Sequence, residues 1–322
     1  MSIFSYDKTY DFAGKQKLFM GVSVLFFAIA LMLLLARGLN FGIDFTGGTL
    51  AQIQYEEVAP IEEIRAALSG TRFEGASIQE FGSPQEVVIR AQVDESGLGM
   101  DVSDEIREHL ATTGAFEVRR VEMVGPRVGA ELREAGIMAM LVAIAGILIY
   151  VTFRFEWRFA IAAVLALMHD IVIVIGFVIL FDIQVNLDIL AALLTILGYS
   201  LNDTIVVFDR IREGLTRAGT NDLKKVINFS VSRTLTRTTI TSVTTFLVVA
   251  TLFLFGGELI KPLALTLMIG VIIGTYSSIF IAASLIRFLG FDVSQWKEKE
   301  ARKAQERAEK ERMRAMYEQG TV

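Results

Sequence analysis

The stretch LFMGVSVLFFAIALMLLLARGLNFGIDFTGGTL, residues 18–50, sets the architecture of the chain. Its first part, residues 18–36, carries no charge. About 20 apolar residues cross the hydrocarbon core of a bilayer, so we expect a membrane helix over residues 18–37. The glycine-rich part that follows, residues 39–50, cannot be a Walker phosphate loop because it contains no lysine. We interpret it as a connector between a membrane helix and a domain on the other side.

The composition supports a membrane protein. Of the 322 residues, 53% are hydrophobic, which is too apolar for an ordinary soluble domain. The chain has no cysteine and two histidines, so we expect neither a disulfide nor a metal site. The predicted fold is an α-helical polytopic membrane protein with six transmembrane helices and one small α+β ferredoxin-like domain between helices 1 and 2. The five further predicted membrane segments are 135–153, 159–181, 185–208, 238–257 and 262–286.

The segment between the first two membrane helices, residues 38–134, is acidic. It holds 18 Asp and Glu against 8 Arg and no Lys, a net charge of −10. A segment of this charge does not enter lipid, and we call it the outer domain. Period-two and three-to-four spacings predict the order β-α-β-β-α-β, the split βαβ arrangement. The strands are expected at 49–56, 76–82, 86–93 and 116–125, and the helices at 60–70 and 102–114.

Basic residues in the short loops predict the orientation. They gather before the first helix, between helices 2 and 3, and between helices 4 and 5, whereas the turns on the other side hold only Lys261. Both termini are therefore expected in the cytoplasm, and residues 38–134 on the outer side of the membrane. The predicted division is a cytoplasmic N-terminus (1–17), helix 1 (18–37), a periplasmic domain with connectors (38–134), helices 2–6 (135–287) and a charged cytoplasmic tail (288–322).

Ionisable side chains inside the predicted helices mark a candidate site. A charge at the centre of a membrane helix costs about 2.5–3.5 kcal/mol on insertion scales, so each requires a reason. Asp170 follows His169 in the third helix, Asp203 lies in the fourth with Tyr199 on the same face, and Arg237 opens the fifth. We predict that these five groups form a proton relay through water.

Each of these residues also has a plainer interpretation. Asp203 and Arg237 could form a static ion pair that holds two helices together. Arg237 could instead extend its charge to the interface, as arginines near helix ends do. His169 could simply satisfy Asp170 with a hydrogen bond.

Small residues recur in the sixth segment at four-residue spacing. Such a stripe allows close helix approach. Packing within the chain is the simpler interpretation, although a subunit contact or a sliding interface would use the same feature. The positions predicted for helix packing are Gly270, Gly274 and Ser278, with Thr266 and Ala282 on the same stripe.

Two connectors flank the outer domain. Gly47 and Gly48 allow positive φ or close backbone approach, and Asp44 is expected to cap backbone amides within its own turn. Gly125 and Pro126 lie at the other end of the domain. We predict that these five residues form a hinge, through which movement in the membrane reaches the outer domain.

No enzyme signature is present. The sequence contains no Walker loop, no dinucleotide fingerprint and no HExxH motif, so neither an enzyme nor a cofactor is predicted. Any work must draw on another source of energy. One charge that crosses 100 mV releases about 2.3 kcal/mol, which is comparable with a modest conformational preference.

Several motifs together resemble the SecF branch of the SecD/SecF family, within the resistance-nodulation-division superfamily. The resemblance covers nearly the whole chain apart from the tail. It implies a six-helix inner-membrane subunit that pairs with SecD, associates with the SecYEG channel and possibly YajC, and couples the proton motive force to late preprotein translocation and release. The motifs are LNFGIDFTGGTL, VGPRVGAELREAG, LMHDIVIVIG, ILGYSLNDTIVVFDRIREGL, SRTLTRTTITS and FLFGGELIKPLALTLMIGVIIGTYSSIFIA.

The resemblance also implies roles for residues and partners. The membrane acid of the family falls on Asp203, the arginine of its T-L-x-R-T motif falls on Arg237, and Asp170 fits the pattern more weakly. The main relay acid of the family lies on SecD. The implied ligands are protons, membrane lipid and a translocating preprotein, with no nucleic acid.

Two other functions fit the same pattern. The chain could be half of a proton-driven small-molecule or lipid exporter of the same superfamily, or a passive scaffold of the translocon. An edge of the outer sheet could accept an extended client by strand addition. The charged tail could dock a partner, although such runs are usually solvated helices.

Overall fold

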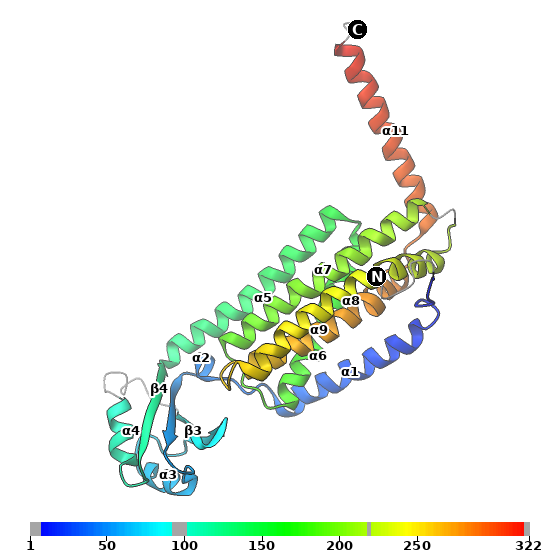
Figure 1. The fold of residues 1–322 in the computed structure, drawn as a ribbon. Helices are drawn as coiled ribbons and strands as arrows, with labels where there is room; N and C mark the ends of the chain where they lie inside the picture. Colours follow the sequence, from blue (N-terminus) through cyan, green and yellow to red (C-terminus); the bar gives the residue numbers. More distant parts are fainter. Residues whose placement is uncertain (1–7, 92–101, 218–219, 319–322) are drawn as a thin grey trace.

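The computed structural model describes residues 8–91, 102–217 and 220–318. The first seven residues of the predicted N-terminus, residues 92–101 of the outer domain, the loop residues 218–219 and the last four residues of the tail lie outside this description. The described chain forms a helical unit with the outer domain at one end. A single helix projects from the other end (Figure 1).

Within the described ranges, six helical spans are long and apolar enough to cross a membrane, which confirms the predicted fold class. The span from Trp157 and the last span are the most buried, so they form the centre of the unit. The first five spans are α1 (Gln16–Arg37), α5 (Pro126–Arg154), α6 (Trp157–Leu180), α7 (Leu187–Arg217) and α8 (Leu223–Phe255). The sixth consists of α9 (Lys261–Tyr276), η2 (Ser277–Ala282) and α10 (Ala283–Phe288).

Three helices extend beyond the predicted membrane segments. α5 begins at Pro126 rather than 135, α7 ends at Arg217 rather than 208, and α8 begins at Leu223 rather than 238. The inner ends of α7 and α8 continue as helices because their apolar faces form one core cluster. Charged residues on the outer faces lower the mean hydropathy there, which hides these turns from a hydropathy criterion. The fully buried members from the two helices are Val207, Phe208, Ile211, Leu215, Val226 and Val231.

In its described residues the outer domain forms a four-stranded antiparallel sheet in the order β2-β3-β1-β4, as the split βαβ pattern predicts. Two helices cover one face, and their apolar stripes fill the core with Ile53 and Ile89 of the sheet. The strands are β1 (Gly48–Tyr55), β2 (Ser77–Phe81), β3 (Ser83–Ala91) and β4 (Phe116–Val124), and the helices are α3 (Ile61–Leu68) and α4 (Val102–Leu110).

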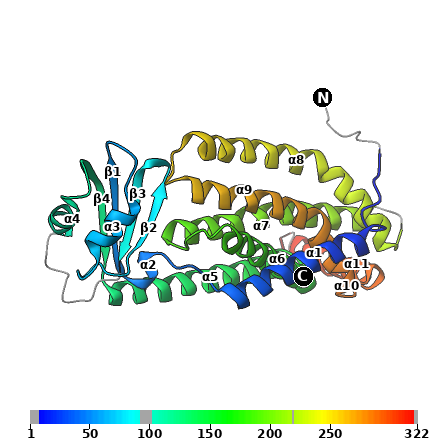
Figure 2. The ribbon, with the colours of Figure 1, turned by 90° about the horizontal axis from the view of Figure 1, so that it is seen from below.

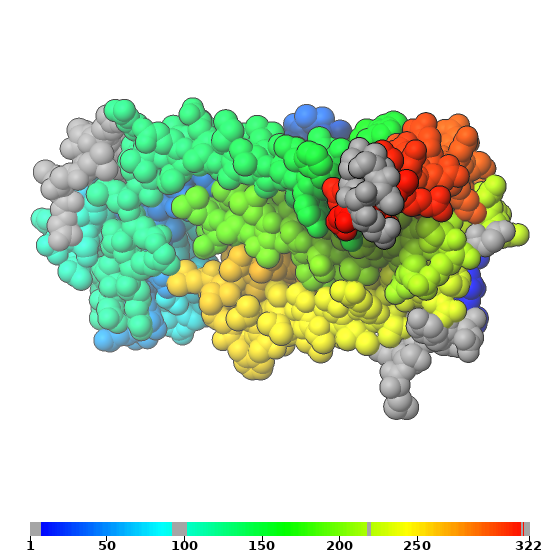
Figure 3. All heavy atoms as spheres, turned by 90° about the horizontal axis from the view of Figure 1, so that it is seen from above, coloured from blue at the N-terminus to red at the C-terminus, as the bar shows by residue number. Residues whose placement is uncertain are grey.

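The other face of the sheet looks toward the turns between the membrane helices (Figure 2). The outer domain lies against the end of the helical unit (Figure 3), and a polar hollow of about 340 Å³ remains between them. Alternate residues of the strands line it, including Gln52 and Arg90, opposite Asp182 and Glu258 of the turns. Burial lowers the pKa of Arg90, and the nearby Asp182 carboxylate opposes that shift. The two parts therefore meet through charged and polar side chains.

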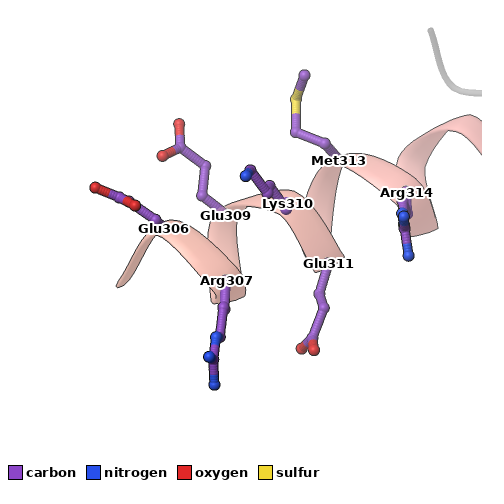
Figure 4. Close-up of a pocket in the computed structure, with 7 residues that line it drawn as sticks. All are labelled: Glu306, Arg307, Glu309, Lys310, Glu311, Met313 and Arg314. Carbon is purple, nitrogen blue, oxygen red and sulfur yellow. The ribbon is translucent and has the colours of Figure 1, made fainter. Parts of the chain in front are cut away.

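The tail forms one long helix, α11 (Val293–Glu318). Its charged side chains point away from the helix in several directions (Figure 4). The hollow drawn there is lined by this helix alone, between Glu306 and Arg314. It is open space along an exposed helix, and it does not define a site.

Candidate functional site

Asp170 lies at the centre of a buried polar cluster. Its side chain has no exposed surface. The Ser200 hydroxyl of α7 donates to Oδ2 at 2.5 Å, and Nδ1 of His169 lies 2.9 Å from Oδ1. The His169 ring stacks on Phe27 of α1 with 6.5 Å between centroids. These contacts join α1, α6 and α7 around one carboxyl group, and a hydroxyl this close to a carboxylate makes a strong bond.

Asp203 is buried in a different way. Only 3% of its surface is exposed, yet Oδ2 has no hydrogen-bond partner in the described part of the chain. The buried hydroxyls of Thr204 on α7 and Thr238 on α8 also have no partner among these residues. A buried polar atom without a partner costs free energy. These three oxygens could therefore form further hydrogen bonds, with a proton on the carboxylate or with a water molecule.

Arg237 lies on α8, which packs on α7, but its side chain is exposed. Within residues 8–91, 102–217 and 220–318, no ion pair joins Arg237 to Asp203. The static pair that was one interpretation of these two residues is therefore not made.

Tyr199 belongs to a separate chain of hydroxyl groups. Its Oη donates to Ser242 Oγ at 3.0 Å, and Thr275 Oγ1 donates to the same oxygen at 2.7 Å. Ser242 in turn donates to the carbonyl oxygen of Thr238 at 2.8 Å. The five predicted relay residues thus fall into three groups, around Asp170, at Asp203 with Arg237 nearby, and at Tyr199.

Sequence reasoning missed several members of these groups. Ser200 lies three residues before Asp203, a spacing that places both on one face of a helix, but its hydroxyl donates to Asp170. Ser242 and Thr275 were not singled out. The density of Ser and Thr in α8, and of small polar residues at the end of α9, was the available signal.

The small-residue stripe of the last helix packs against α7. A Cβ added at Gly270 would overlap Ile196, and one at Gly274 would lie 3.0 Å from Cβ of Ser200. Ser278 is fully buried, and its hydroxyl donates to the carbonyl oxygen of Thr275. The glycines therefore allow α9 to approach the helix that carries the polar groups.

The two connectors of the outer domain touch each other. Gly47 has φ +74°, and a Cβ there would lie 2.6 Å from Cα of Pro126. Gly48 has φ +130°, and its Cβ would lie 2.6 Å from the carbonyl oxygen of Ala91. Gly125 is the N-cap of α5, and Pro126 is its first residue. Glycine is required at 47 and 48 both for positive φ and for space.

Asp44 does not cap its own turn, and that prediction is wrong. It lies in a short helix, α2 (Ile43–Thr46), and its Oδ2 accepts a hydrogen bond from the backbone N–H of Leu187. The carboxylate therefore satisfies the first N–H of α7, beside Asn186, which caps the helix by accepting from the N–H of Ile189 at 3.0 Å. A local turn pattern could not indicate a partner 143 residues away.

These features define the class of the protein. It is a multi-pass membrane protein built from one six-helix unit, with a small outer domain fastened to it and carboxyl groups buried in its helices.

Comparison with known proteins identifies the family. Residues 105–292 match the family described as "Protein export membrane protein SecD/SecF, C-terminal", and residues 33–57 match the "SecD/SecF GG Motif". The protein translocase subunit SecF of Helicobacter pylori strain J99 is 46% identical over 94% of both chains. The SecF of Pseudomonas aeruginosa is 43% identical over 87% of this chain and 92% of its own.

A solved structure gives the same result. The crystal structure of SecDF from Thermus thermophilus, described as a translocon-associated membrane protein, superposes with a TM-score of 0.79 and 34% identity. The match covers 92% of this chain and 40% of the SecDF chain. The chain belongs to the SecD/SecF family, and its relatives within that family are SecF subunits.

Proposed function

We propose that this chain is the SecF subunit of a bacterial protein-export system, and that it acts with a SecD chain in the inner membrane. The pair assists late steps of preprotein translocation and release, beside the SecYEG channel and YajC, and it draws on the proton motive force. Both termini lie in the cytoplasm and the outer domain lies in the periplasm. The family membership and the likeness to SecDF support this proposal.

One observation carries the proton role. Asp203 is buried in a membrane helix and keeps one carboxylate oxygen without a partner in the described chain. A purely structural carboxylate at this depth would be expected to be paired. A carboxyl group that exchanges a proton with a partner acid needs an oxygen that is free of other hydrogen bonds. Such an acid would come from the SecD chain, because the exposed sides of α7 and α8 are open to a neighbour.

The test is Asp203→Asn in vesicles that hold SecYEG, SecD and this chain. We expect export to lose its dependence on the proton gradient, while ATP-driven export without a gradient is unchanged. The matched control is Asp188→Asn, an exposed acid in the first turn of the same helix. If gradient-dependent export survives in Asp203→Asn, the chain is a passive scaffold and the proposal fails.

Arg237 provides a second, independent step. Because it makes no ion pair with Asp203 in the described chain, Arg237→Gln should change the stability of the protein by less than about 0.5 kcal/mol. Gradient-driven export should nevertheless fall, and Arg237→Lys should retain part of it because the charge remains but the planar fork is lost. Arg233→Gln, one turn earlier on α8, is the control for a lost positive charge. Equal export in both glutamine variants would remove Arg237 from the mechanism.

The outer domain is proposed to meet the emerging client. Its sheet has two edge strands, β2 and β4, and an unpaired edge can add an extended chain. A cross-linking scan along both edges against a stalled preprotein tests this role. Adducts on neither edge would remove strand addition while the proton role of Asp203 stands.

A further inference from the structure

The polar hollow beneath the outer sheet contains an arginine whose hydrogen bonds are incomplete. Arg90 of β3 lines this hollow, and its Nη1 donates to Oε1 of Gln79 on β2 at 2.9 Å. Its Nε is buried and has no hydrogen-bond partner among the residues that the structure describes. A buried donor of a charged group that lacks a partner costs free energy. An opposite charge nearby would offset this cost.

The hollow offers two carboxylates that are not already paired. Four acids line it, and two of these form ion pairs with a neighbour on their own strand or turn. These pairs are Glu122 with Arg120 and Glu258 with Lys261. Among the described residues, Asp182 and Asp188 make no ion pair. Of these two, Asp182 is the one whose carboxylate opposes the fall in the pKa of Arg90 that burial causes.

The backbone at Asp182 is unfavourable for an acidic residue. Asp182 has φ 51°, and within the described ranges it is the only residue other than glycine with a positive φ. The N–H of Ile183 donates to the carbonyl oxygen of Val178 at 2.9 Å, so α6 ends in a Schellman motif, where glycine or asparagine is usual at this position. A carboxylate is also disfavoured there because the C-terminal end of a helix is the negative end of its dipole. The negative charge of Asp182 therefore needs a reason outside the helix.

The turn between α6 and α7 is fixed to the connector that leads to the outer domain. Asn40 Nδ2 donates to Oδ1 of Asp182 at 3.1 Å, and the carbonyl oxygen of Asn40 accepts from the N–H of Val185 at 2.7 Å. The same turn joins the helix of Asp170 to the helix of Asp203. The Asp182 carboxylate is thus held between the uncovered face of the outer sheet and the two helices that carry the buried acids.

We propose that Arg90 and Asp182 form an electrostatic latch that holds the uncovered face of the outer sheet against the turn between α6 and α7. Their attraction across the hollow keeps the outer domain docked, and the free Nε of Arg90 can bond the carboxylate directly when the hollow narrows. The latch is separate from the covalent connectors, which hold the ends of the domain rather than its open face. It does not depend on the proton role of Asp203.

The distance between two spin labels on the purified full chain in lipid vesicles tests the proposal. The labels are attached through Glu108→Cys on α4 and Phe255→Cys at the outer end of α8, which are exposed positions in a chain without native cysteine. Pulsed electron resonance then gives the ratio of docked to undocked outer domains. In Arg90→Gln and in Asp182→Asn this ratio should fall by about two- to fivefold, as expected for one partly screened charge pair. The double variant should fall no further than either single variant.

Asp182→Asn separates the charge from the structure of the turn. Asparagine tolerates positive φ, and its amide oxygen can still accept the bond from Asn40. The melting temperature of this variant should therefore not fall, although its outer domain is released. If Asp182 served only the turn, the docked ratio would stay at the wild-type value, and the latch would be excluded.

Two further variants control for the loss of a charge. Asp188→Asn removes the other unpaired acid of the hollow, and Arg119→Gln removes an exposed arginine of β4 that does not line it. Both should leave the docked ratio unchanged. The proposal is overturned if Arg90→Gln behaves like Arg119→Gln, if Asp182→Asn behaves like Asp188→Asn, or if the effects of Arg90→Gln and Asp182→Asn add in the double variant. Because no proton gradient is applied, none of these outcomes bears on Asp203.

Discussion

The Asp44 carboxylate accepts a hydrogen bond from the backbone N–H of Leu187 at 2.9 Å and so joins the connector after α1 to the outer end of α7. A second bond, from Gly42 N–H to the carbonyl oxygen of Val185 at 2.9 Å, fastens the same two segments. α7 is the helix that carries Asp203 and Ser200. A shift of α7 along its axis would therefore pull directly on the connector to the first strand of the outer domain.

Removal of this bond should weaken both stability and coupling. Asp44→Ala removes the acceptor of the first N–H of α7, while Asn186 still caps the helix through the N–H of Ile189. A lost hydrogen bond costs about 0.5–1.5 kcal/mol, so the melting temperature of the purified chain should fall. Gradient-driven export should fall as well, while a SecD chain still copurifies. Asp44→Asn should be milder because its amide oxygen can still accept the bond. Asp188→Asn removes an acid from the same helix start without removing the bond between Asp44 and Leu187, and an equal effect in that variant would contradict the link.

Gly47→Ala should be among the most damaging substitutions of a small residue in the outer domain. At φ +74° and ψ 166° Gly47 lies in a region essentially limited to glycine, which costs about 1–3 kcal/mol in a residue with a Cβ, and the overlap with Pro126 adds about 1–3 kcal/mol. Gly70→Ala is the matched control, because Gly70 has nearly the same φ, +75°, with nothing within 4 Å of the added atom. Thermal unfolding of both variants separates the two contributions. An equal fall in melting temperature in the two variants would show that the contact between Gly47 and Pro126 does not contribute to stability.

The outer domain could be predicted from the sequence, whereas the helix ends and the partners within the site could not, and each outcome has a physical reason. Apolar and polar residues alternate along β1 and β3 because helices cover only one face of the sheet. The outer domain could therefore be predicted from local sequence. Helix length could be predicted only where hydropathy marks the bilayer, which is why the inner turns of α7 and α8 were missed. The site depends on partners from distant segments. Residue spacing places Ser200 on a face of α7, but it does not say that Asp170 lies opposite.

Acid should release the N-terminal segment from α8, because Asp11 anchors it there through a hydrogen bond with Asn228. Asn228 Nδ2 and the backbone N–H of Gly14 both donate to Oδ1 of Asp11 at 2.8 Å, and these bonds lower the pKa of Asp11 from its ordinary value of 3.8. The anchor is therefore complete above pH 3.8 and is lost as the pH falls through the lowered pKa. Hydrogen exchange of residues 8–15, compared with Asp11→Ala at each pH, measures this. The protection relative to Asp11→Ala should be present at neutral pH and should disappear in acid. Protection that persists below the lowered pKa would contradict it.

A designed disulfide tests whether the outer domain moves during export. An added Cβ at Gly82, in the β2–β3 turn, would lie 3.5 Å from Cβ of Glu258, in the turn between α8 and α9. This separation suits a disulfide, which needs about 3.5–4.5 Å between these atoms. The chain has no cysteine of its own, so the pair Gly82→Cys and Glu258→Cys permits a single link within one chain.

The link would fix the free edge of the sheet to the outer end of the helical unit. If the connectors act as a hinge, oxidation of the double variant should suppress gradient-driven export, and a reductant should restore it. The two single variants, oxidised in the same way, control for the positive φ of Gly82 and for the lost ion pair between Glu258 and Lys261. Export at the normal rate by fully cross-linked protein would mean that the outer domain works while fixed to this turn, and the hinge would have to be abandoned.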